Sequence, residues 1–591
     1  MRSRTTFTIT TTLTAAACAA VLLSANDAPA PRFRPEDPVQ TDHDTRLDAG
    51  RPGRDPLGAY ADFFVNTVMS PGDRQDIQAL NTNTLDEVPD SSWFTNRIGA
   101  RAMTLDEITR GPDRVDRLDI HDWVIVAGKS TGRQAGFVAV SASDPRGQRY
   151  QIELDSKSNP EMATGAEIIG TTIYHAIGFN VVDTYLIDLD PAKLTIAPTA
   201  KVGRGWEKRR FTRRDLDVLL RQAAKQPNGR YRASASRYAD GRDLGPFRYY
   251  GTRPDDPNDI YPHEHRRELR GNRVFCAWLN HDDSRAVNSL DMLAGPEGRR
   301  HVKHYMFDFG SMLGSGTSEE DLPWVGHEHL VEPRAGLRTL ASLGLWRRPF
   351  MRVKAPSHLP AAGNFTADRF GPETWKPHYP NAAFANMRDD DGFWAARIVS
   401  AFSDEAIRLI VEKAAYTDPA VTDHMIGTLI KRRDLVARAW LAKTNPIAGV
   451  EVERDGLLRF RNPAVDAGLV ETAPRYKLYW FRFDNRTGAR HYVAQTQTAE
   501  PVAAPPSVVL ANSEYWGVEI RTVHDEHPGW EMPVRLYIRQ GGTPRLVGLE
   551  RVGSQIRRPD RLPAGQCTVG QATLTSNDRR CATQVAAAPR H

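Results

Sequence analysis

Three short apolar runs broken by glycines, followed at once by a helical run, constrain the fold of this 591-residue chain more than any other feature. The runs cover residues 123–127, 137–140 and 149–154, and an Asp-Pro-Arg-Gly turn leads into the third. Short apolar runs bounded by glycine and turn residues are typical of strands in hairpins. The sequence therefore predicts three antiparallel strands, with a first hairpin that carries Gly128, Gly132 and Gly136.

A helix and a further strand are expected directly after this hairpin sheet. Apolar side chains recur at helical spacing over residues 161–177 and stop at Gly178, and residues 182–189 form the next predicted strand. Residues 190–262 hold one predicted helix, 214–224, and then a long polar stretch that we interpret as a functional or crossing loop. Downstream, helices are predicted at 264–280, 393–414 and 421–443, and a strand at 304–307.

From residue 457 the pattern changes to alternation, which is typical of a β-sandwich. Strands are expected at 476–483, 491–497, 507–510, 515–524 and 534–540, ahead of a loop-rich tail. The aromatic residues of these strands are expected to fill the core of the sandwich, and a carbohydrate-binding face is the alternative. They are Tyr476, Tyr479, Trp480, Phe481, Phe483, Tyr515 and Trp516.

The first 30 residues have the pattern of a secretory signal. Arg2 and Arg4 precede an apolar run over residues 7–25, and small residues at Ala28 and Ala30 suit cleavage. A lipoprotein anchor on Cys18 and an uncleaved membrane anchor are the alternatives. The sequence therefore predicts an exported protein, periplasmic, on the cell surface or secreted, and no later run is apolar and long enough for a transmembrane span in the mature chain.

Cysteine use and charge limit the choice of partners. Cys567 and Cys581 flank a short polar loop, where a disulfide is expected in an exported protein, whereas Cys276 lies in an apolar helical pattern and is expected to be buried. The chain carries 78 basic and 73 acidic residues, a formal balance of +5, without a long basic block. This distribution indicates neither nucleic-acid binding nor a polybasic membrane anchor.

The densest polar motif is the run His281-Asp-Asp-Ser-Arg-Ala-Val-Asn288, which follows a predicted helix. A predicted strand then leads into Asp308-Phe-Gly310. Phosphoryl transfer needs one carboxylate near the attacking hydroxyl, and an amide and a second carboxylate to hold metal against the phosphates. Asp283 can take the first role, with Asp282 as the alternative, and Asn288 and Asp308 can take the other two.

The spacing Asp-x4-Asn and the Asp-Phe-Gly after a strand resemble the active site of the protein-kinase-like superfamily, in an atypical form. The stretch from Gly165 to Ile187 is similar to HipA-like kinases, and the general plan to spore-coat CotH-like kinases and Golgi secreted kinases. The resemblance covers about residues 120 to 440. It implies that the glycine hairpin covers nucleotide phosphates, that Glu167 orders the nucleotide side, and that ATP or another nucleotide binds with Mg²⁺ or Mn²⁺.

The third strand departs from the kinase pattern, because Glu153 stands where the resemblance expects a phosphate-contacting lysine. Lys157, four residues further on, is taken as the nucleotide-binding lysine, and Lys129 in the glycine hairpin is the alternative. A glutamate at this position adds repulsion toward phosphates unless a metal lies between them.

Other polar residues are given structural roles. The run at 251–270 is rich in Asp, Arg and His and is interpreted as turn and cap residues paired with helix arginines, with a cation or acceptor surface as the alternative. His281 and His304 are interpreted as structural histidines.

These observations predict an α+β chain, with a two-lobed protein-kinase-like fold followed by a small all-β, sandwich-like domain. The expected divisions are a signal peptide (1–30), an extended arm (31–118), an N-lobe (119–200), a C-lobe with a long loop (201–445) and a β-rich domain with its tail (446–591). The predicted function is phosphoryl transfer from a nucleotide to a hydroxyl of a protein or glycan. The alternatives are an inactive pseudokinase that serves as an envelope or extracellular binding protein and, less favoured, a metal-dependent hydrolase.

Overall fold

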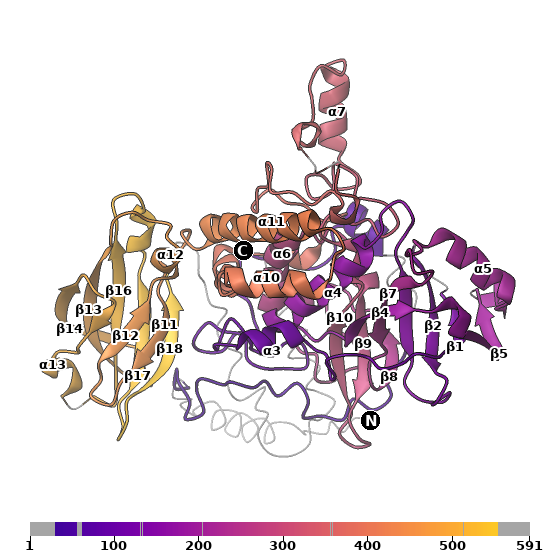
Figure 1. Cartoon of the computed structure of the whole chain (residues 1–591). Helices are drawn as coiled ribbons and strands as arrows, with labels where there is room; N and C mark the ends of the chain where they lie inside the picture. The colour runs from indigo at the N-terminus through magenta and orange to yellow at the C-terminus, as the bar shows by residue number, and fades with distance from the viewer. Residues whose placement is uncertain are drawn as a thin grey trace, which may run out of the picture.

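The structure is a computed structural model that describes residues 30–552, apart from 56–61, 130–131, 133, 204, 355, 357 and 512. Nearly all of the expected signal segment, Cys18, and the expected pair Cys567 and Cys581 lie outside the described residues. Figure 1 shows a sheet-rich part at one end, a helical part in the middle and a β domain at the other end. The chain is therefore α+β with a separate C-terminal β domain, which confirms the predicted fold class.

A seven-stranded mixed sheet in the order β4-β7-β3-β2-β1-β5-β6 forms the first lobe. Strands β1, β2 and β3 pair antiparallel in sequence, as predicted from the glycine-bearing hairpin. The apolar face of the sheet has its own core, which includes Ile125, Phe137 and Ile152. The strands are β1 (Trp123–Gly128), β2 (Ala135–Ser141), β3 (Tyr150–Leu154), β4 (Thr184–Leu189), β5 (Leu194–Val202), β6 (Arg209–Arg210) and β7 (Tyr231–Arg237).

The sheet continues to residue 237, past residue 200, where the sequence placed the end of the first lobe. Strands β5 and β7 were not expected, because the first is partly exposed and the second is built from small residues such as Ala233 and Ala235. Between them lies the expected helix, α5 (Arg213–Gln222), which begins with a capping box at Thr212. Much of the expected long loop is therefore sheet and helix.

Helix α4 (Met162–Ile177) connects β3 to β4 and joins the two lobes. It contacts β3, β4 and β7 on the sheet side and the short helix η6 (Phe309–Ser311) on the other side. Its isoleucines, including Ile168, Ile169 and Ile173, belong to the core of the helical lobe. A helix buried on nearly all sides holds its polar side chains rigidly, which matters for Glu167 below.

The second lobe is mainly helical. Its helices are α6 (Arg267–Leu279), α7 (Pro333–Ala341), α8 (Ala382–Ala385), α9 (Asp389–Ser400), α10 (Asp404–Lys413) and α11 (Pro419–Trp440). The single helix expected over 393–414 is in fact α9 and α10, because Ser403 caps a new helix by accepting a hydrogen bond from the Ala406 N–H. A three-stranded sheet, β10-β9-β8, also lies in this lobe. Its strands are β8 (Arg242–Gly245), β9 (Ser289–Ala294) and β10 (His301–Met306).

The C-terminal domain packs a five-stranded antiparallel sheet, β14-β13-β16-β17-β18, against a three-stranded sheet, β11-β12-β15. Side chains from both sheets share one core, including Leu458 from the small sheet and Trp480 from the large one. The strands are β11 (Ala448–Val452), β12 (Leu458–Arg461), β13 (Arg475–Phe483), β14 (Arg490–Thr498), β15 (Val502–Ala503), β16 (Tyr515–Val523), β17 (Val534–Arg539) and β18 (Arg545–Arg551). Short helices α12 (Pro463–Asp466) and α13 (Ser507–Leu510) complete the domain.

Two expectations about the β domain are decided by this packing. Residues 507–510 form α13 and not a strand, because a four-residue apolar run does not distinguish the two and Pro506 precedes it. Three of the seven aromatic residues, Tyr476, Trp480 and Trp516, lie in the core between the two sheets, as favoured from the sequence. Phe481, Phe483 and Tyr515 lie instead in a second buried cluster with Phe33 of the N-terminal segment, and Tyr479 is half-buried.

The N-terminal segment packs onto both later parts of the chain. Its regular elements are η1 (Val65–Met69) and α3 (Leu105–Arg110). Most of it lacks helix or strand, yet Trp93 and Phe94 are buried in the core of the helical lobe and Phe33 is buried in the β domain. The expected arm is thus an integral layer of the fold. Within the part of the chain that the structure describes, no helix combines the length and the apolar character needed to cross a bilayer.

Candidate functional site

Helix α4 places Glu167 beneath the Asp-Phe-Gly motif. The Glu167 side chain is buried, and its carboxylate lies close to Gly310, where a Cβ would lie 3.7 Å from Glu167 Oε2. Gly170, one turn further along the helix, lets the motif approach: a Cβ there would lie 2.6 Å from the Phe309 Cβ. The helix and the motif are therefore in close contact.

The loop after α6 places Asp283 and Asn288 side by side. The Asn288 amide nitrogen donates to the Asp283 carboxylate at 2.8 Å and to the Asp283 carbonyl at 2.9 Å. The carboxylate also contacts the Arg285 guanidinium and the His378 imidazole. Burial opposes ionisation of Asp283, but its hydrogen bond with His378 and the charge of Arg285 outweigh burial, so its pKa lies below the ordinary value. Asp283 is thus a fixed, ionised carboxylate.

Asp308 follows β10 and faces this loop. The Phe307 N–H donates to the Asn288 carbonyl at 3.3 Å, which holds the end of β10 against the loop. Asp308 has a left-handed backbone (φ 65°), which aspartate tolerates better than most residues. Burial, and next the negative charge of Glu153, raise the pKa of Asp308 to about 7, and Asp283 adds to the effect. Asp283, Asn288 and Asp308 therefore come together, as the sequence predicted.

A lysine reaches the same place from the glycine hairpin. The Lys129 ammonium forms an ion pair with the Glu153 carboxylate, and both side chains are largely buried. Glu153 lies opposite Gly136 in the β2–β3 pairing, so β3 presents this glutamate to the hairpin. Of the two lysines considered from the sequence, the structure brings Lys129 to the site.

Lys157 does not share this environment. It lies beyond the end of β3 and is exposed, and its backbone N–H donates to the Gln222 carbonyl at 3.3 Å. Sequence reasoning favoured Lys157 because it is the lysine nearest to Glu153 along the chain. The extended length of a lysine side chain instead lets Lys129 cross from the end of β1 to β3.

The three hairpin glycines have packing roles in the structure. A Cβ on Gly128 would lie 2.7 Å from the Phe211 ring, and one on Gly136 would lie 2.5 Å from the Ile152 carbonyl oxygen. Gly132 has φ of 80°, and a Cβ there would meet the Lys129 side chain at 3.1 Å. These glycines let the hairpin close on its neighbours.

The acidic groups around Lys129 are not balanced by positive charge. Burial, and next the charges of Glu153 and Asp308, raise the pKa of Glu167 to about 8. One oxygen of this carboxylate, Oε2, is buried without a hydrogen-bond partner. Oxygen atoms of carboxylates and amides are the ligands that Mg²⁺ prefers. The donor set of Asn288 and Asp308, with Glu167 behind them, therefore fits a hard divalent cation.

A second acidic pair adjoins Asp283 on the other side. Burial, and next the charge of Asp283, raise the pKa of Asp321 to about 8. Burial, and next the charge of Asp321, raise the pKa of Asp282, the alternative catalytic aspartate. His378 lies 3.6 Å from the Asp282 carboxylate and 3.3 Å from that of Asp283, and so links the two. No local sequence pattern singles out Asp321 or His378.

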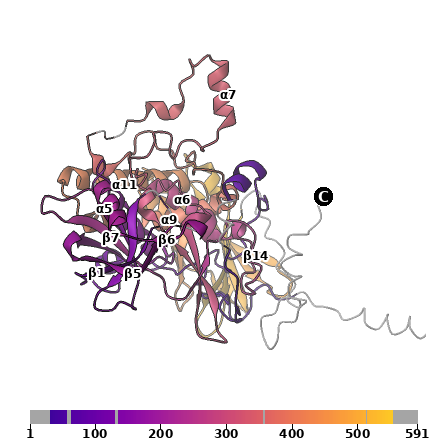
Figure 2. The same ribbon diagram turned by 90° about the vertical axis from the view of Figure 1, so that its right-hand side faces the viewer.

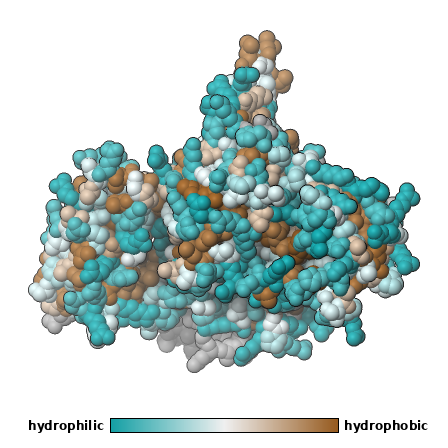
Figure 3. Space-filling model, in the orientation of Figure 1, coloured by the Kyte–Doolittle hydropathy of each residue, from teal (hydrophilic) through white to brown (hydrophobic). Residues whose placement is uncertain are grey.

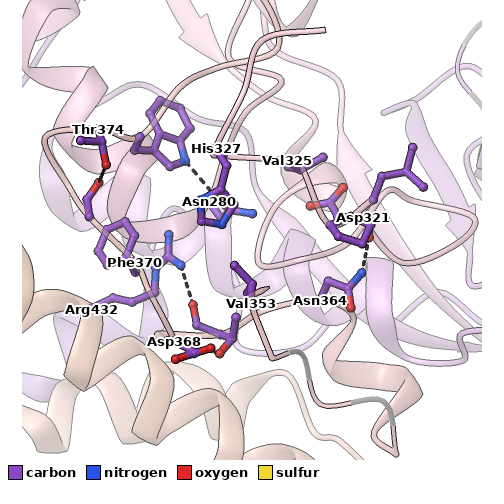
Figure 4. A pocket seen from close by; sticks show the side chains of 16 residues that line it. Asn280, Asp321, Val325, His327, Val353, Asn364, Asp368, Phe370, Thr374 and Arg432 are labelled. Carbon is purple, nitrogen blue, oxygen red and sulfur yellow. Dashed lines mark hydrogen bonds between the residues drawn. The ribbon is translucent and has the colours of Figure 1, made fainter. Parts of the chain in front are cut away.

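Asp321 lines a cavity of about 80 Å³ at the end of α6 (Figure 4). Arg432 of α11 lies on the opposite side of it and donates to the carbonyls of Thr366, Ala277 and Trp278. Burial lowers the pKa of Arg432 to about 9. This cavity adjoins Asp283 through Asp321.

The residues expected to be structural are engaged in packing. His304 stacks on Trp93 with ring centres 3.5 Å apart and hydrogen-bonds to Asp291. His281 packs against Phe309. Cys276 is a buried free thiol.

The run at 251–270 is likewise a structural network. Asp259 binds His263 at 2.7 Å and Arg266 at 3.4 Å, and all three side chains are buried. This favours the turn and cap interpretation over a cation site.

No family model and no curated protein matches the chain. Among solved structures, a Helicobacter pylori proinflammatory kinase, CtkA, is similar over 52% of this chain and 92% of its own, with 12% identity and a TM-score of 0.28. At that TM-score the likeness carries no argument, so the functional case depends on the side chains described above.

Proposed function

We propose that the chain is an exported, nucleotide-dependent phosphotransferase of the atypical kinase type, acting on a hydroxyl of a protein or glycan. The observation that carries this proposal is the meeting of Asp283, Asn288 and Asp308 opposite the Lys129–Glu153 pair, with Glu167 buried behind them. Five separate segments supply these groups, and together they form the set that phosphoryl transfer requires.

Asp283 is the group that receives the proton of the acceptor hydroxyl. The hydroxyl oxygen attacks the terminal phosphorus of the nucleotide, its proton passes to the carboxylate, and the bond to the nucleoside diphosphate breaks. The contacts with Asn288, Arg285 and His378 fix the orientation of Asp283. Fixed orientation lowers the entropy cost of reaching the reactive geometry.

The nucleotide side consists of Lys129, Asn288 and Asp308. Asn288 and Asp308 would hold Mg²⁺ or Mn²⁺, which when bound neutralises charge on the phosphate oxygens. The amide nitrogen of Asn288 is already used by Asp283, so its amide oxygen is the atom that faces a cation. Lys129 would bind phosphate oxygens once it leaves Glu153. Gln134 lies beside Gly310 and covers the site from the side of the hairpin.

One observation favours a second candidate, a catalytically inactive pseudokinase that binds partners in the envelope or outside the cell. Lys129 is neutralised by Glu153 in the structure, and a lysine held in this way stabilises phosphates less. In this case the acidic cluster still binds a cation and nucleotide, but transfer does not follow.

Isothermal titration of the mature protein with ATP, in the presence of Mg²⁺, Mn²⁺ or neither, tests the shared part of both candidates. We expect binding that requires the metal and that Asp308→Ala abolishes. Asp423→Ala, which removes an exposed carboxylate on α11, is the matched control and should bind as the wild type does. Absence of nucleotide binding under every metal condition would refute the phosphotransferase proposal.

A radiolabelled γ-phosphate assay then separates the candidates. If label is transferred to the protein itself or to envelope extracts, and Asp283→Asn abolishes this transfer, the result supports the transferase. Metal-dependent binding without any transfer supports the pseudokinase.

A further inference from the structure

A projecting arm, residues 330–354, stands out from the helical lobe. It contains helix α7 and the short helix η7 (Pro349–Arg352). Both ribbon views show α7 well away from the body of the molecule (Figures 1 and 2). The arm is inserted between the Asp-Phe-Gly motif and α8, and none of the proposed catalytic groups comes from it.

The outer part of the arm is strongly apolar and exposed. Leu340, Leu343 and Leu345 at the tip are 73%, 91% and 85% exposed, and Leu337 and Met351 are also more than half exposed. Figure 3 shows hydrophobic residues gathered at this tip. Isolated exposed leucines need no explanation, but a group of them on a projecting element marks an interaction surface.

The turn at the tip has a defined conformation. Leu343 and Gly344 both have left-handed backbones, and the Gly344 N–H donates to the Thr339 carbonyl at 2.9 Å. The Trp346 N–H donates to the Ser342 hydroxyl at 3.0 Å, and the Arg338 guanidinium lies over the Trp346 ring at 4.5 Å. The leucines are therefore presented outward by a hydrogen-bonded turn.

The same arm is rich in positive charge. Residues 330–354 contain six basic residues and one acidic residue, Glu332, which is paired with Lys376. The cations alternate with apolar residues, so they form no basic block in the sequence. They are Arg334, Arg338, Arg347, Arg348, Arg352 and Lys354.

At the base of the arm the cations line a hollow. A cavity of about 240 Å³ is bounded by Arg347, Arg352 and Arg369, together with His327 and Trp346. Three arginines around one cavity form a site for an anion, since guanidinium groups bind phosphate oxygens with paired hydrogen bonds.

We propose that this arm docks the protein on an anionic phospholipid surface, with the leucines of the tip between the lipid chains and a lipid phosphate in the arginine-lined hollow. Apolar side chains next to Lys and Arg are the combination that inserts into the membrane interface. The positive charge of the arm favours an anionic lipid surface over a second copy of the chain, because two arms placed together would bring like charges close to one another. The docking would hold the proposed active site close to a membrane, and it does not depend on catalysis.

Vesicle co-sedimentation of the full mature chain tests the proposal. The probes are phosphatidylcholine vesicles with and without 30 mol% phosphatidylglycerol, a composition chosen so that about a third of the lipids are anionic. The wild type should sediment with anionic vesicles and much less with neutral ones. Since each Lys or Arg near such a surface raises affinity about fivefold, Arg352→Gln with Arg369→Gln should weaken binding at least tenfold. Leu343→Ser with Leu345→Ser should weaken it by a similar factor.

Two control pairs make the test specific. Val115→Ser with Val508→Ser removes exposed apolar residues elsewhere, and Arg213→Gln with Arg214→Gln removes exposed cations on α5. Both pairs should bind as the wild type does. Equal binding to neutral vesicles or unchanged binding by the arm variants would overturn the proposal. It would also be overturned if sedimentation velocity without lipid showed dimers that Leu343→Ser with Leu345→Ser dissociates.

Discussion

Two groups of buried charges in this protein differ in how well they are compensated. Around α6, the Arg267 guanidinium contacts Asp390 at 2.9 Å and Asp391 at 3.1 Å, and it also pairs with Asp86. At the junction of the lobes, four carboxylates, those of Glu153, Glu167, Asp308 and Asp283, share the cations Lys129 and Arg285. Arg270, Arg388 and Arg551 also pair with these aspartates, so the first group is balanced within the protein, whereas the second has surplus negative charge.

The pKa shifts of Arg267, Glu167 and Asp308 follow this difference, although burial, and next the charge of Asp390, also raise the pKa of Asp391 to about 6. Burial disfavours the charged form of Arg267, but its three aspartates outweigh burial and raise its pKa. For Glu167 and Asp308 burial and like charges act in the same direction and raise the pKa to about 8 and about 7. A compensated cluster stabilises a fold, while an uncompensated one is a binding site for the missing charge.

The largest expected effect comes from breaking the compensated cluster. Arg267→Met removes the cation and leaves three aspartates buried together, which should lower the free energy of unfolding by about 3–5 kcal/mol. Chemical denaturation monitored by tryptophan fluorescence measures this change. Asp308→Asn, in the uncompensated cluster, removes a repelling charge and should leave stability unchanged or raise it. If both variants lost stability equally, the distinction between the clusters would fail.

The pH dependence of the uncompensated cluster is the next effect in size. Because the folded protein keeps a proton on Glu167 up to about pH 8 and the unfolded chain loses it near 4.5, this group stabilises the fold at low pH. Its contribution should fall as pH rises from about 5 to 8. We expect the difference in free energy of unfolding between the wild type and Glu167→Gln to decline by about 2 kcal/mol over that range. One pKa unit corresponds to about 1.4 kcal/mol, and relaxation of the protein around the buried carboxylate reduces the full value. A difference that is constant with pH, or that increases, would contradict the assignment.

The sequence predicted the parts of the site that depend on local pattern. Helical periodicity placed Glu167, and the spacing of Asp283 and Asn288 within one loop, with Asp308 after a strand, placed the three groups that meet. Such features are fixed by a few neighbouring residues. Local sequence patterns also predicted the order of the first three strands.

Features that depend on register or distant segments could not be predicted. The Lys129–Glu153 pair follows from the alignment of β2 with β3, and a shift of one residue would turn Glu153 to the other face. Asp321 and His378 reach Asp282 and Asp283 from irregular segments far along the chain. Strand β7 was missed because Ala233, Ser234 and Ala235 give almost no hydrophobic signal.

Separate replacement of Lys129 and Lys157 tests which of the two lysines belongs to the uncompensated cluster. Lys129→Met should weaken ATP binding about tenfold to thirtyfold, because this hydrogen bond between charged groups is expected to contribute about 1.5–2 kcal/mol, the lower part of the range for such bonds. Lys157→Met should change affinity less than twofold, since Lys157 is exposed beyond β3. Titration calorimetry with Mg²⁺ and ATP compares the two variants directly. The reverse order of effects would place the nucleotide on the Lys157 side of the sheet.

The smallest expected effect comes from Glu153→Gln, which removes one negative charge from the cluster and releases Lys129. ATP should then bind two- to fivefold more tightly, because Lys129 no longer has to break an ion pair before it meets phosphate. Gln keeps the side-chain length, so the register of β3 is preserved. In a transferase, Glu153→Gln would change transfer as well as affinity, whereas in a pseudokinase only the affinity would respond. Weaker binding in this variant would mean that Glu153 itself holds the cation, and the surplus charge of the cluster would then belong to a metal site that includes β3.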